Sequence, residues 1–237
     1  MISCYHLIIQ HPTGERPLLE DISVDIARGE FVEIIGPSGA GKSLLCSVFG
    51  LRRRVQGAKC IVVGRNIDRL APSKVTQVRQ KIGTHSQRPE FLEERSLLQN
   101  LLLPLVARGK TDGALQKVQT LISGTALEVL SEVPIRGLSA GQRTLASIFR
   151  ALVGQPELVL LDGGLQGLGE LEGDAISALR QVSRAGSTVV LAARELSPCA
   201  DLRTQVIRLD AGRVVSVQRS AEPEPDVTSV SGITEVR

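Results

Sequence analysis

One segment of the sequence combines glycines, a lysine and a hydroxyl at a spacing suited to binding phosphate. Residues 36–43 match the pattern G-x-x-x-x-G-K-[ST] and stand between an apolar run and a segment with helical character. Glycines let successive backbone N–H groups converge on phosphate oxygens, and the positive end of the following helix points at the same oxygens. Lys42 supplies a charge for the β- and γ-phosphates, and Ser43 supplies a ligand for Mg²⁺. We therefore expect a nucleotide-binding segment made of Gly36, Pro37, Ser38, Gly39, Ala40, Gly41, Lys42, Ser43 and Leu44.

Two later segments have the same kind of chemistry. The first opens a run with helical spacing and reads Leu138, Ser139, Ala140, Gly141, Gln142. A serine hydroxyl, a glycine N–H and a helix N-terminus together make an anion site. The second is an apolar run, residues 158–161, that ends in Asp162. An aspartate there either caps the next turn or holds a metal ion, and the upstream phosphate-binding pattern favours the metal.

In this order the three motifs resemble the ABC ATPase family, whose signature reads Leu-Ser-Gly-Gly-Gln, over about residues 15–217. The resemblance implies an α/β P-loop NTPase fold: a RecA-like core, N-terminal antiparallel β elements and a helical subdomain at about 88–152. It implies ATP and Mg²⁺ as cofactors, with Ser43, Gln87 and Asp162 as the metal-binding residues. If Gln87 does not bind the metal, it is a solvated glutamine in a loop. The resemblance also implies that the signature, residues 138–142, closes over ATP bound by a second subunit, in a homodimer or a heterodimer.

The sequence departs from that family where hydrolysis is carried out. Gly163 stands where the family has a catalytic glutamate, Gly169 where it has an aspartate between subunits, and Arg194 where it has a switch histidine. We therefore expect no ordinary catalytic base and weak or absent hydrolysis. Three nearby carboxylates are either substitutes for the base or plain solvated charges: Glu170, Glu172 and Glu195. The aromatic residue that stacks on adenine is also missing, with Pro12 beside His11 at its place and Tyr5 as an earlier candidate.

The periodicity predicts the elements that hold these residues in place. Strands are expected at 18–35 around a turn at 28–30, and at 58–63, 158–161 and 188–192, with a hairpin at 205–209 and 214–217. Helices are expected at 42–50, at 114–130 and from Gln142 to the breaker at 154–156. One domain should span residues 1–218. The Pro-, Glu-, Ser- and Thr-rich remainder, 219–237, is typical of a disordered tail.

Composition restricts the function classes. Hydrophobic residues make up 42% and charged residues 22%, as in ordinary globular proteins. A net charge of +3 argues against a nucleic-acid partner, and the basic triplet 52–54 reads as a solvated helix end. Scattered Cys4, Cys46, Cys60 and Cys199 favour reduced thiols in a cytosolic protein. We expect neither a secretory signal nor a spanning helix, because the longest apolar run, near 101–107, is short and contains Pro104.

The single cassette resembles small bacterial subunits of the lipoprotein-release, macrolide-efflux, lipid-transport and cell-division types, particularly over 91–105. Leu97, Leu98, Leu101 and Leu102 either line a groove for a membrane partner or belong to the core. We expect a cytoplasmic subunit on the inner face of the membrane that binds MgATP, dimerises and couples to an integral permease-type protein. A hydrolytically competent transport ATPase, with a non-standard base or an intact partner cassette, is the alternative. A soluble repair or translation protein is disfavoured, because no long coiled coil lies between 42 and 139 and there is one cassette.

Overall fold

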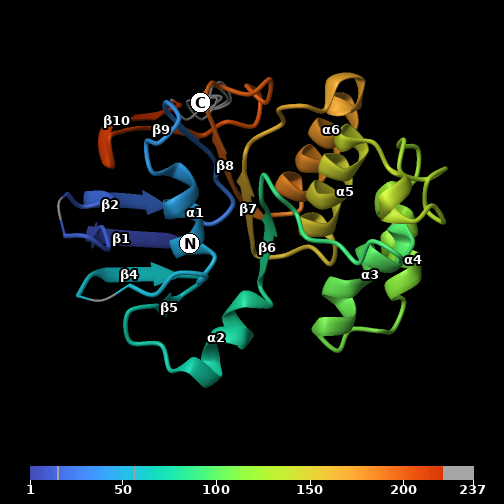
Figure 1. The fold of residues 1–237 in the computed structure, drawn as a ribbon, viewed down its shortest axis with the longest axis horizontal. Helices are drawn as coiled ribbons and strands as arrows, with labels where there is room; N and C mark the ends of the chain where they lie inside the picture. Colours follow the sequence, from blue (N-terminus) through green and yellow to red (C-terminus); the bar gives the residue numbers. More distant parts are fainter. Residues whose placement is uncertain (15, 56, 221–237) are drawn as a thin grey trace, which may run out of the picture.

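A six-stranded sheet occupies the centre of the computed structural model, which describes residues 1–14, 16–55 and 57–220 (Figure 1). Its strand order is β10-β9-β3-β8-β7-β6, parallel except for the β9–β10 hairpin. The strands are β3 (Phe31–Ile35), β6 (Ile82–His85), β7 (Leu158–Asp162), β8 (Thr188–Ala193), β9 (Gln205–Asp210) and β10 (Arg213–Arg219). Parallel strands end at a common edge, so the segments that follow Ile35, Asp162 and Ala193 meet there.

A second, antiparallel sheet in the order β2-β1-β4-β5 lies beside the first. It consists of β1 (Ile2–Ile9), β2 (Leu19–Ile26), β4 (Lys59–Val62) and β5 (Arg65–Asn66). Apolar residues of both sheets and of helix α1 (Lys42–Phe49) form one core. The N-terminal antiparallel β elements that the resemblance implied are therefore present, including β1, which periodicity alone did not predict.

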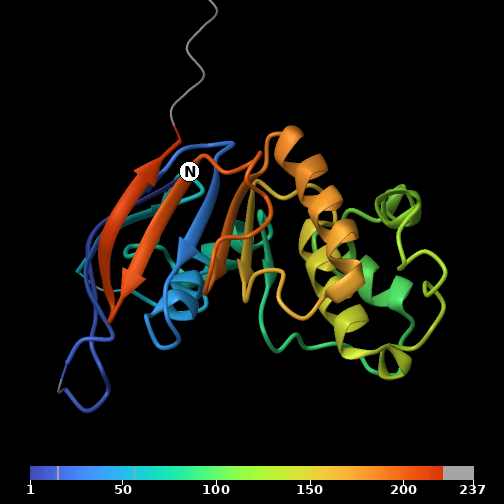
Figure 2. The ribbon, with the colours of Figure 1, turned by 90° about the horizontal axis from the view of Figure 1, so that it is seen from above.

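Helices cover the opposite side of the central sheet (Figure 2). They are α3 (Leu97–Ala107), α4 (Ala114–Ile122), α5 (Ala140–Leu152) and α6 (Glu172–Arg184); α2 (Pro72–Arg79) leads into β6. Short 3₁₀ turns span Ile135–Gly137 and Gly169–Leu171. The helix predicted for 114–130 ends early, at Ile122, because Ser123 leaves the helical conformation and Gly124 follows with a φ of 74°. Fully buried Leu97 and Leu101 belong to the core, whereas Leu98 and Leu102 are only partly buried.

The structure contradicts the expectation of four reduced thiols. Cys4 and Cys60 stand opposite each other on the adjacent strands β1 and β4, and a disulfide joins them. Their 56-residue separation in sequence concealed this pairing. Cys46 and Cys199 are free, as expected, and both are buried.

The C-terminal boundary lies slightly later than predicted. β10 includes Arg219, and the Ser220 amide donates to the Thr204 carbonyl at 2.9 Å. The rest of the predicted tail, 221–237, falls outside the described residues. Within 1–14, 16–55 and 57–220, none of the helices has the length and hydropathy needed to cross a bilayer.

Candidate functional site

The glycine-rich segment 36–43 connects the carboxyl end of β3 to the first turn of α1, as predicted. Lys42 folds back over it, and its Nζ donates to the carbonyl oxygens of Gly36 and Pro37 at 2.7 Å each. A Cβ on Gly36 would meet the Leu209 carbonyl oxygen at 2.0 Å. Gly41 has a φ of 97°, and a Cβ there would meet the Leu19 side chain at 2.6 Å. A side chain at either position would therefore collide with a neighbour, a backbone oxygen at Gly36 and a leucine side chain at Gly41.

A cavity of about 420 Å³ opens beside this loop. Residues from five separate segments line it: Leu18, Ser38, Gly39, Ala40, Gly41, Lys42, Ser43, Leu44, Gln87, Gly163, Gln166, Ala192, Ala193 and Arg194. The structure thus brings predicted Gln87 and Arg194 to the phosphate-binding loop. Cavities of this size and polar lining accept small-molecule ligands.

The cavity is electropositive. Burial lowers the pKa of Lys42 most strongly, and the nearby Arg194 cation lowers it further, while Asp162 and the Cys46 thiol act in the opposite direction. Arg194 is exposed to solvent at the cavity wall. Two cations that repel each other across a cavity are stabilised by a bound polyanion, because its charge offsets both.

The residues predicted to hold Mg²⁺ present oxygen donors at the same place. The Ser43 hydroxyl donates to Asp162 Oδ1 at 2.8 Å. Ser43 and Gln87 line the cavity, and Asp162 is reached through Ser43 rather than lining it. Hydroxyl, carboxylate and amide oxygens are the ligands that Mg²⁺ prefers. Across the described residues there is no group of three His, Cys, Asp or Glu side chains arranged to hold a metal. The set therefore fits a magnesium ion whose remaining ligands are phosphate oxygens and water.

The loop after β7 carries no carboxylate into the cavity. Gly163 has a φ of 116°, its N–H donates to the Ala192 carbonyl at 3.0 Å, and a Cβ would lie 2.7 Å from Gln87 Cγ. The part of the cavity wall that the structure describes includes neither aspartate nor glutamate. The candidate substitutes Glu170, Glu172 and Glu195 stand on the 3₁₀ turn, at the start of α6 and in the loop after β8, and none of them lines the cavity.

The signature segment forms the exposed N-terminus of α5. Ser139 caps the helix: its Oγ accepts the Gln142 N–H at 3.3 Å, and its own N–H donates to Gln142 Oε1 at 2.8 Å. Ser139 and Ala140 face solvent and do not line the cavity of their own chain. A Cβ on Gly141 would lie 3.2 Å from the Gly167 carbonyl, so this helix end packs against the loop that follows β7.

Two arginines that sequence reasoning missed join α5 to the segment after Gln87. Arg143 forms a bidentate ion pair with Glu93. Arg150 donates to the Glu90 carbonyl at 2.7 Å, and its guanidinium lies 4.3 Å from the centre of the Phe91 ring. Their spacing of seven residues, which places them on one helix face, was the available signal.

The adenine-stacking candidates stand outside the cavity. His11 Nδ1 lies 2.7 Å from the Thr13 hydroxyl, and Tyr5 is an exposed residue of β1 with the Lys59 ammonium 5.9 Å from its ring centre. Leu18 is the apolar residue from the N-terminal region that lines the cavity wall. An aliphatic side chain in this place carries no aromatic signal that a sequence search would find.

Residues 19–165 match the sequence profile of the family described as "ABC transporter". The chain belongs to the ABC transporter family. The chain is 30% identical over 224 residues to the cell division ATP-binding protein FtsE of Mycobacterium tuberculosis. The alignment covers 91% of this chain and 94% of FtsE. The chain is 32% identical over 223 residues to the methionine import ATP-binding protein MetN of Cupriavidus pinatubonensis, covering 91% of this chain and 65% of MetN.

Solved structures share the cassette fold. A bacterial ABC transporter cassette determined as a dimer superposes with a TM-score of 0.82 at 23% identity, over 92% of this chain and 98% of that one. The cbiO1 protein of Clostridium perfringens, part of the transporter complex cbiONQ, gives a TM-score of 0.78 at 23% identity, over 92% of this chain and 88% of that one. The ABC cassette and its P-loop NTPase core, expected from the motifs, are confirmed.

Proposed function

We propose that this cassette binds MgATP as the nucleotide-binding subunit of an ABC-type membrane complex, and that it hydrolyses ATP slowly or not at all. One observation carries the proposal: residues 38–44 of the phosphate-binding loop and the cations of Lys42 and Arg194 line the cavity, but no carboxylate lines its described wall. Binding and hydrolysis depend on different groups, so a site can retain the first without the second.

The residues of the loop and its neighbours account for binding. The backbone amides of 38–43 and the N-terminus of α1 would receive the β-phosphate, and Lys42 would exchange its two carbonyl contacts for phosphate oxygens. Arg194 lines the same cavity and would contact the γ-phosphate. Ser43, Asp162 and Gln87 would hold Mg²⁺, which supplies further positive charge to the phosphates when bound.

The exposed signature supports association with a second cassette. Ser139 and the N-terminus of α5 form an anion site that faces solvent, away from the cavity of the same chain. That site would complete a nucleotide site on a second copy or on a different cassette. The second candidate function is a heterodimer. In it, the signature of this chain would complete the nucleotide site of a partner cassette that is competent to hydrolyse ATP.

A relative with a permease part supports a membrane partner for this cassette. The chain is 31% identical over 222 residues to a macrolide export ATP-binding/permease protein of Paracoccus denitrificans. The alignment covers 33% of that longer protein. The exposed or partly buried residues Leu92, Leu98, Leu102 and Leu103 lie on or just before α3, where such a partner would pack. The proposal therefore includes an integral permease-type partner and a peripheral position at the membrane.

Calorimetric titration of the purified chain with MgATP tests the proposal. Lys42→Ala should weaken ATP binding by about 100-fold, because it removes charge-assisted bonds to two phosphates. Lys74→Ala, at an exposed lysine on α2, is the matched control and should bind as the wild type does. Equal affinities in wild type and Lys42→Ala would overturn the assignment of the site.

A further inference from the structure

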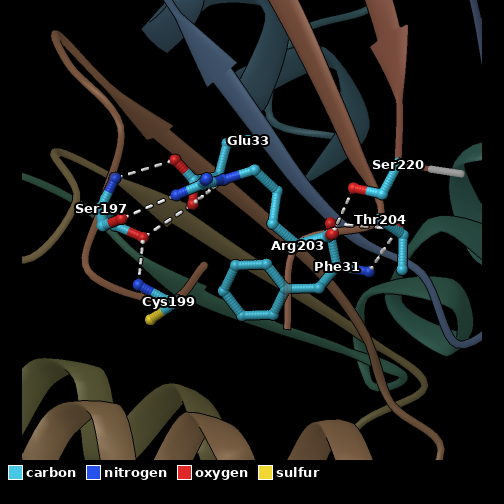
Figure 3. A network of polar contacts seen from close by, with 7 residues as sticks. All are labelled: Phe31, Glu33, Ser197, Cys199, Arg203, Thr204 and Ser220. Atoms are coloured by element: carbon cyan, nitrogen blue, oxygen red, sulfur yellow. Dashed lines mark hydrogen bonds and ion pairs between the residues drawn. The ribbon is translucent and has the colours of Figure 1, made fainter. Parts of the chain in front are cut away.

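A buried glutamate lies in the middle of β3, the strand that leads to the phosphate-binding loop (Figure 3). Glu33 is 0% exposed and pairs in register with Leu191 of β8 on one side and Val206 of β9 on the other. Removing an ionised carboxylate from water is costly unless charged and polar partners replace the water. The partners of Glu33 therefore indicate what this position does.

Every side-chain bond of Glu33 goes to the connection between β8 and β9. The Ser197 amide donates to Oε2 at 2.9 Å and the Ser197 hydroxyl to Oε1 at 2.7 Å. Arg203 Nε donates to Oε1 at 2.8 Å, and Arg203 Nη2 donates to the Ser197 carbonyl at 2.7 Å. The Cys199 amide donates to the Ser197 hydroxyl at 3.2 Å. One carboxylate thus holds the connection at both Ser197 and Arg203, as Figure 3 shows.

This connection contains no helix and crosses over β3. β8 ends at Ala193, beside Ile35, and β9 begins at Gln205, beside Val32 on the opposite flank of β3. Residues 194–204 therefore return from the carboxyl edge of the sheet across one face of β3. A crossover helix would be held in place by its apolar face, whereas here a buried ion pair and two serine hydrogen bonds hold the chain.

Arg194 is the first residue of that crossover and the one that lines the phosphate cavity. It lies between two fixed points, the end of β8 and Ser197. A long, exposed arginine side chain has many rotamers, so the position of its backbone determines which part of the cavity the guanidinium reaches.

We propose that Glu33 is a positioning residue for Arg194: by anchoring Ser197 and Arg203 it directs Arg194 to the place of a terminal phosphate, and so sets the preference for nucleoside triphosphate over diphosphate. The inference rests on the proposed binding of MgATP by this cavity. ADP lacks the phosphate that Arg194 would contact, so a displaced Arg194 weakens ATP binding and leaves ADP binding nearly unchanged.

The test measures ATP and ADP affinities by calorimetry for Glu33→Gln, Arg194→Ala and the double variant. Arg194→Ala should lower the ratio of ATP to ADP affinity by about tenfold. Glu33→Gln should lower it by about threefold or more, and should change it no further when Arg194 is already absent. Thr204→Val is the matched control, because Thr204 also joins the crossover to β3, at Phe31, but at its far end.

Ser197→Ala provides a second variant if Glu33→Gln fails to fold. It removes one hydroxyl and retains the Ser197 amide and Arg203 as partners of Glu33. The ratio of ATP to ADP affinity should fall in this variant too. Equal losses of ATP and ADP affinity would show that Glu33 acts only on stability. An equal change of the ratio in the Arg194→Ala background would show that Glu33 does not act through Arg194. A wild-type chain that binds neither nucleotide would contradict the proposed function itself, whereas ATP binding with an unchanged ratio would contradict this inference alone.

Discussion

Two glycine-rich loops follow parallel strands of the same sheet and border the same cavity, yet they differ in what their glycines do. In the loop of 36–43, a Cβ on Gly36 would collide with the Leu209 carbonyl, and a Cβ on Gly41 would displace the Leu19 side chain. In the loop of 163–169, Gly167 and Gly169 have open space at the position of a Cβ. A backbone contact requires glycine at position 36. At Gly167 and Gly169 a Cβ would have room, and only their positive φ favours glycine, whereas Gly163 in the same loop is crowded by Gln87.

The comparison teaches that nucleotide binding and nucleotide hydrolysis can be separated in one fold. Contacts at Gly36 and Gly41 and the Lys42 hydrogen bonds hold the backbone of the phosphate-binding loop, so its amides and Lys42 remain in place. The second loop keeps its path, with Leu165 and Leu168 buried, but brings no base to the cavity. Each prediction below tests one side of this difference.

The largest expected effect concerns turnover. We expect steady-state phosphate release about 10²–10⁴-fold below that of a cassette with a positioned base, which corresponds to roughly 3–5 kcal/mol of barrier. Gly163→Glu alone should stay within about threefold of the wild type, since the backbone φ of 116° and the contact with Gln87 oppose a side chain there.

The assay uses phosphate release by the chain alone and with a membrane partner, and Lys42→Ala provides the background. Rapid release that disappears in Lys42→Ala would contradict the non-hydrolytic proposal. The base would then have to be Glu170, Glu172, Glu195 or a residue of a partner cassette, and alanine substitution at the three glutamates would separate these possibilities.

The next effect compares the two loops directly. Gly36→Ala should lower the free energy of unfolding by about 3 kcal/mol, because a Cβ 2.0 Å from a backbone oxygen forces the strand end to move. Gly167→Ala meets no atom within 4 Å and should cost only about 1 kcal/mol, for its positive φ. Urea unfolding of both variants measures the difference. Equal costs would mean that the contrast between the loops has no energetic basis.

A smaller effect is expected at the signature. Ser139→Arg should weaken ATP-dependent association about 10–100-fold, because it replaces the helix cap and hydroxyl of the proposed anion site with a bulky cation. Sedimentation with and without MgATP measures this. Ser123→Arg, at the end of α4, is a control for charge at a solvent-facing serine. Association that is the same in Ser139→Arg as in the wild type would exclude the signature from the interface.

Much of the fold followed from local patterns in the sequence. Continuous apolar runs identified β3, β7 and β8, because both faces of these strands are buried. The phosphate-binding loop was found because its residues are adjacent in the chain. α6 was missed, since Gly173, Asp174 and Ser177 weaken its helical pattern, and its stability comes from apolar packing in the core.

The parts of the site that depend on distant contacts were not predictable. Glu33 reads as a charge that interrupts an apolar strand, and only the crossover of 194–204 explains why it is buried. The Cys4–Cys60 disulfide depends on the register of β1 with β4. Gly163 was noted as a missing carboxylate, but its positive φ and its proximity to Gln87 come from three-dimensional structure.

The smallest effect tests the connection between the two sides of the site. His85 ends β6, just before the segment that leads to Gln87, and its Nδ1 lies 2.9 Å from the Ser147 hydroxyl of α5, the signature helix. Burial lowers the pKa of His85 to about 4, and the Arg150 cation contributes in the same direction. The folded protein therefore keeps His85 neutral at a pH where the unfolded chain, with an ordinary pKa of about 6.5, takes up a proton. Stability contributed by the neutral ring is present above about pH 6.5 and is lost as the pH falls toward 4.

Between pH 7.5 and 5.5 this linkage should lower the free energy of unfolding by about 1.4 kcal/mol. His85→Gln keeps a hydrogen-bonding side chain but does not titrate, so its free energy of unfolding should fall by about 1.4 kcal/mol less than that of the wild type over the same interval. Urea unfolding at the two pH values measures the difference, with His6→Gln, at an exposed histidine of β1, as the matched substitution. An identical pH dependence in the wild type and His85→Gln would mean that His85 is not held neutral between the sheet and the signature helix. In that case the contact with Ser147 would not contribute to joining the phosphate-binding side of the molecule to the side that faces a partner.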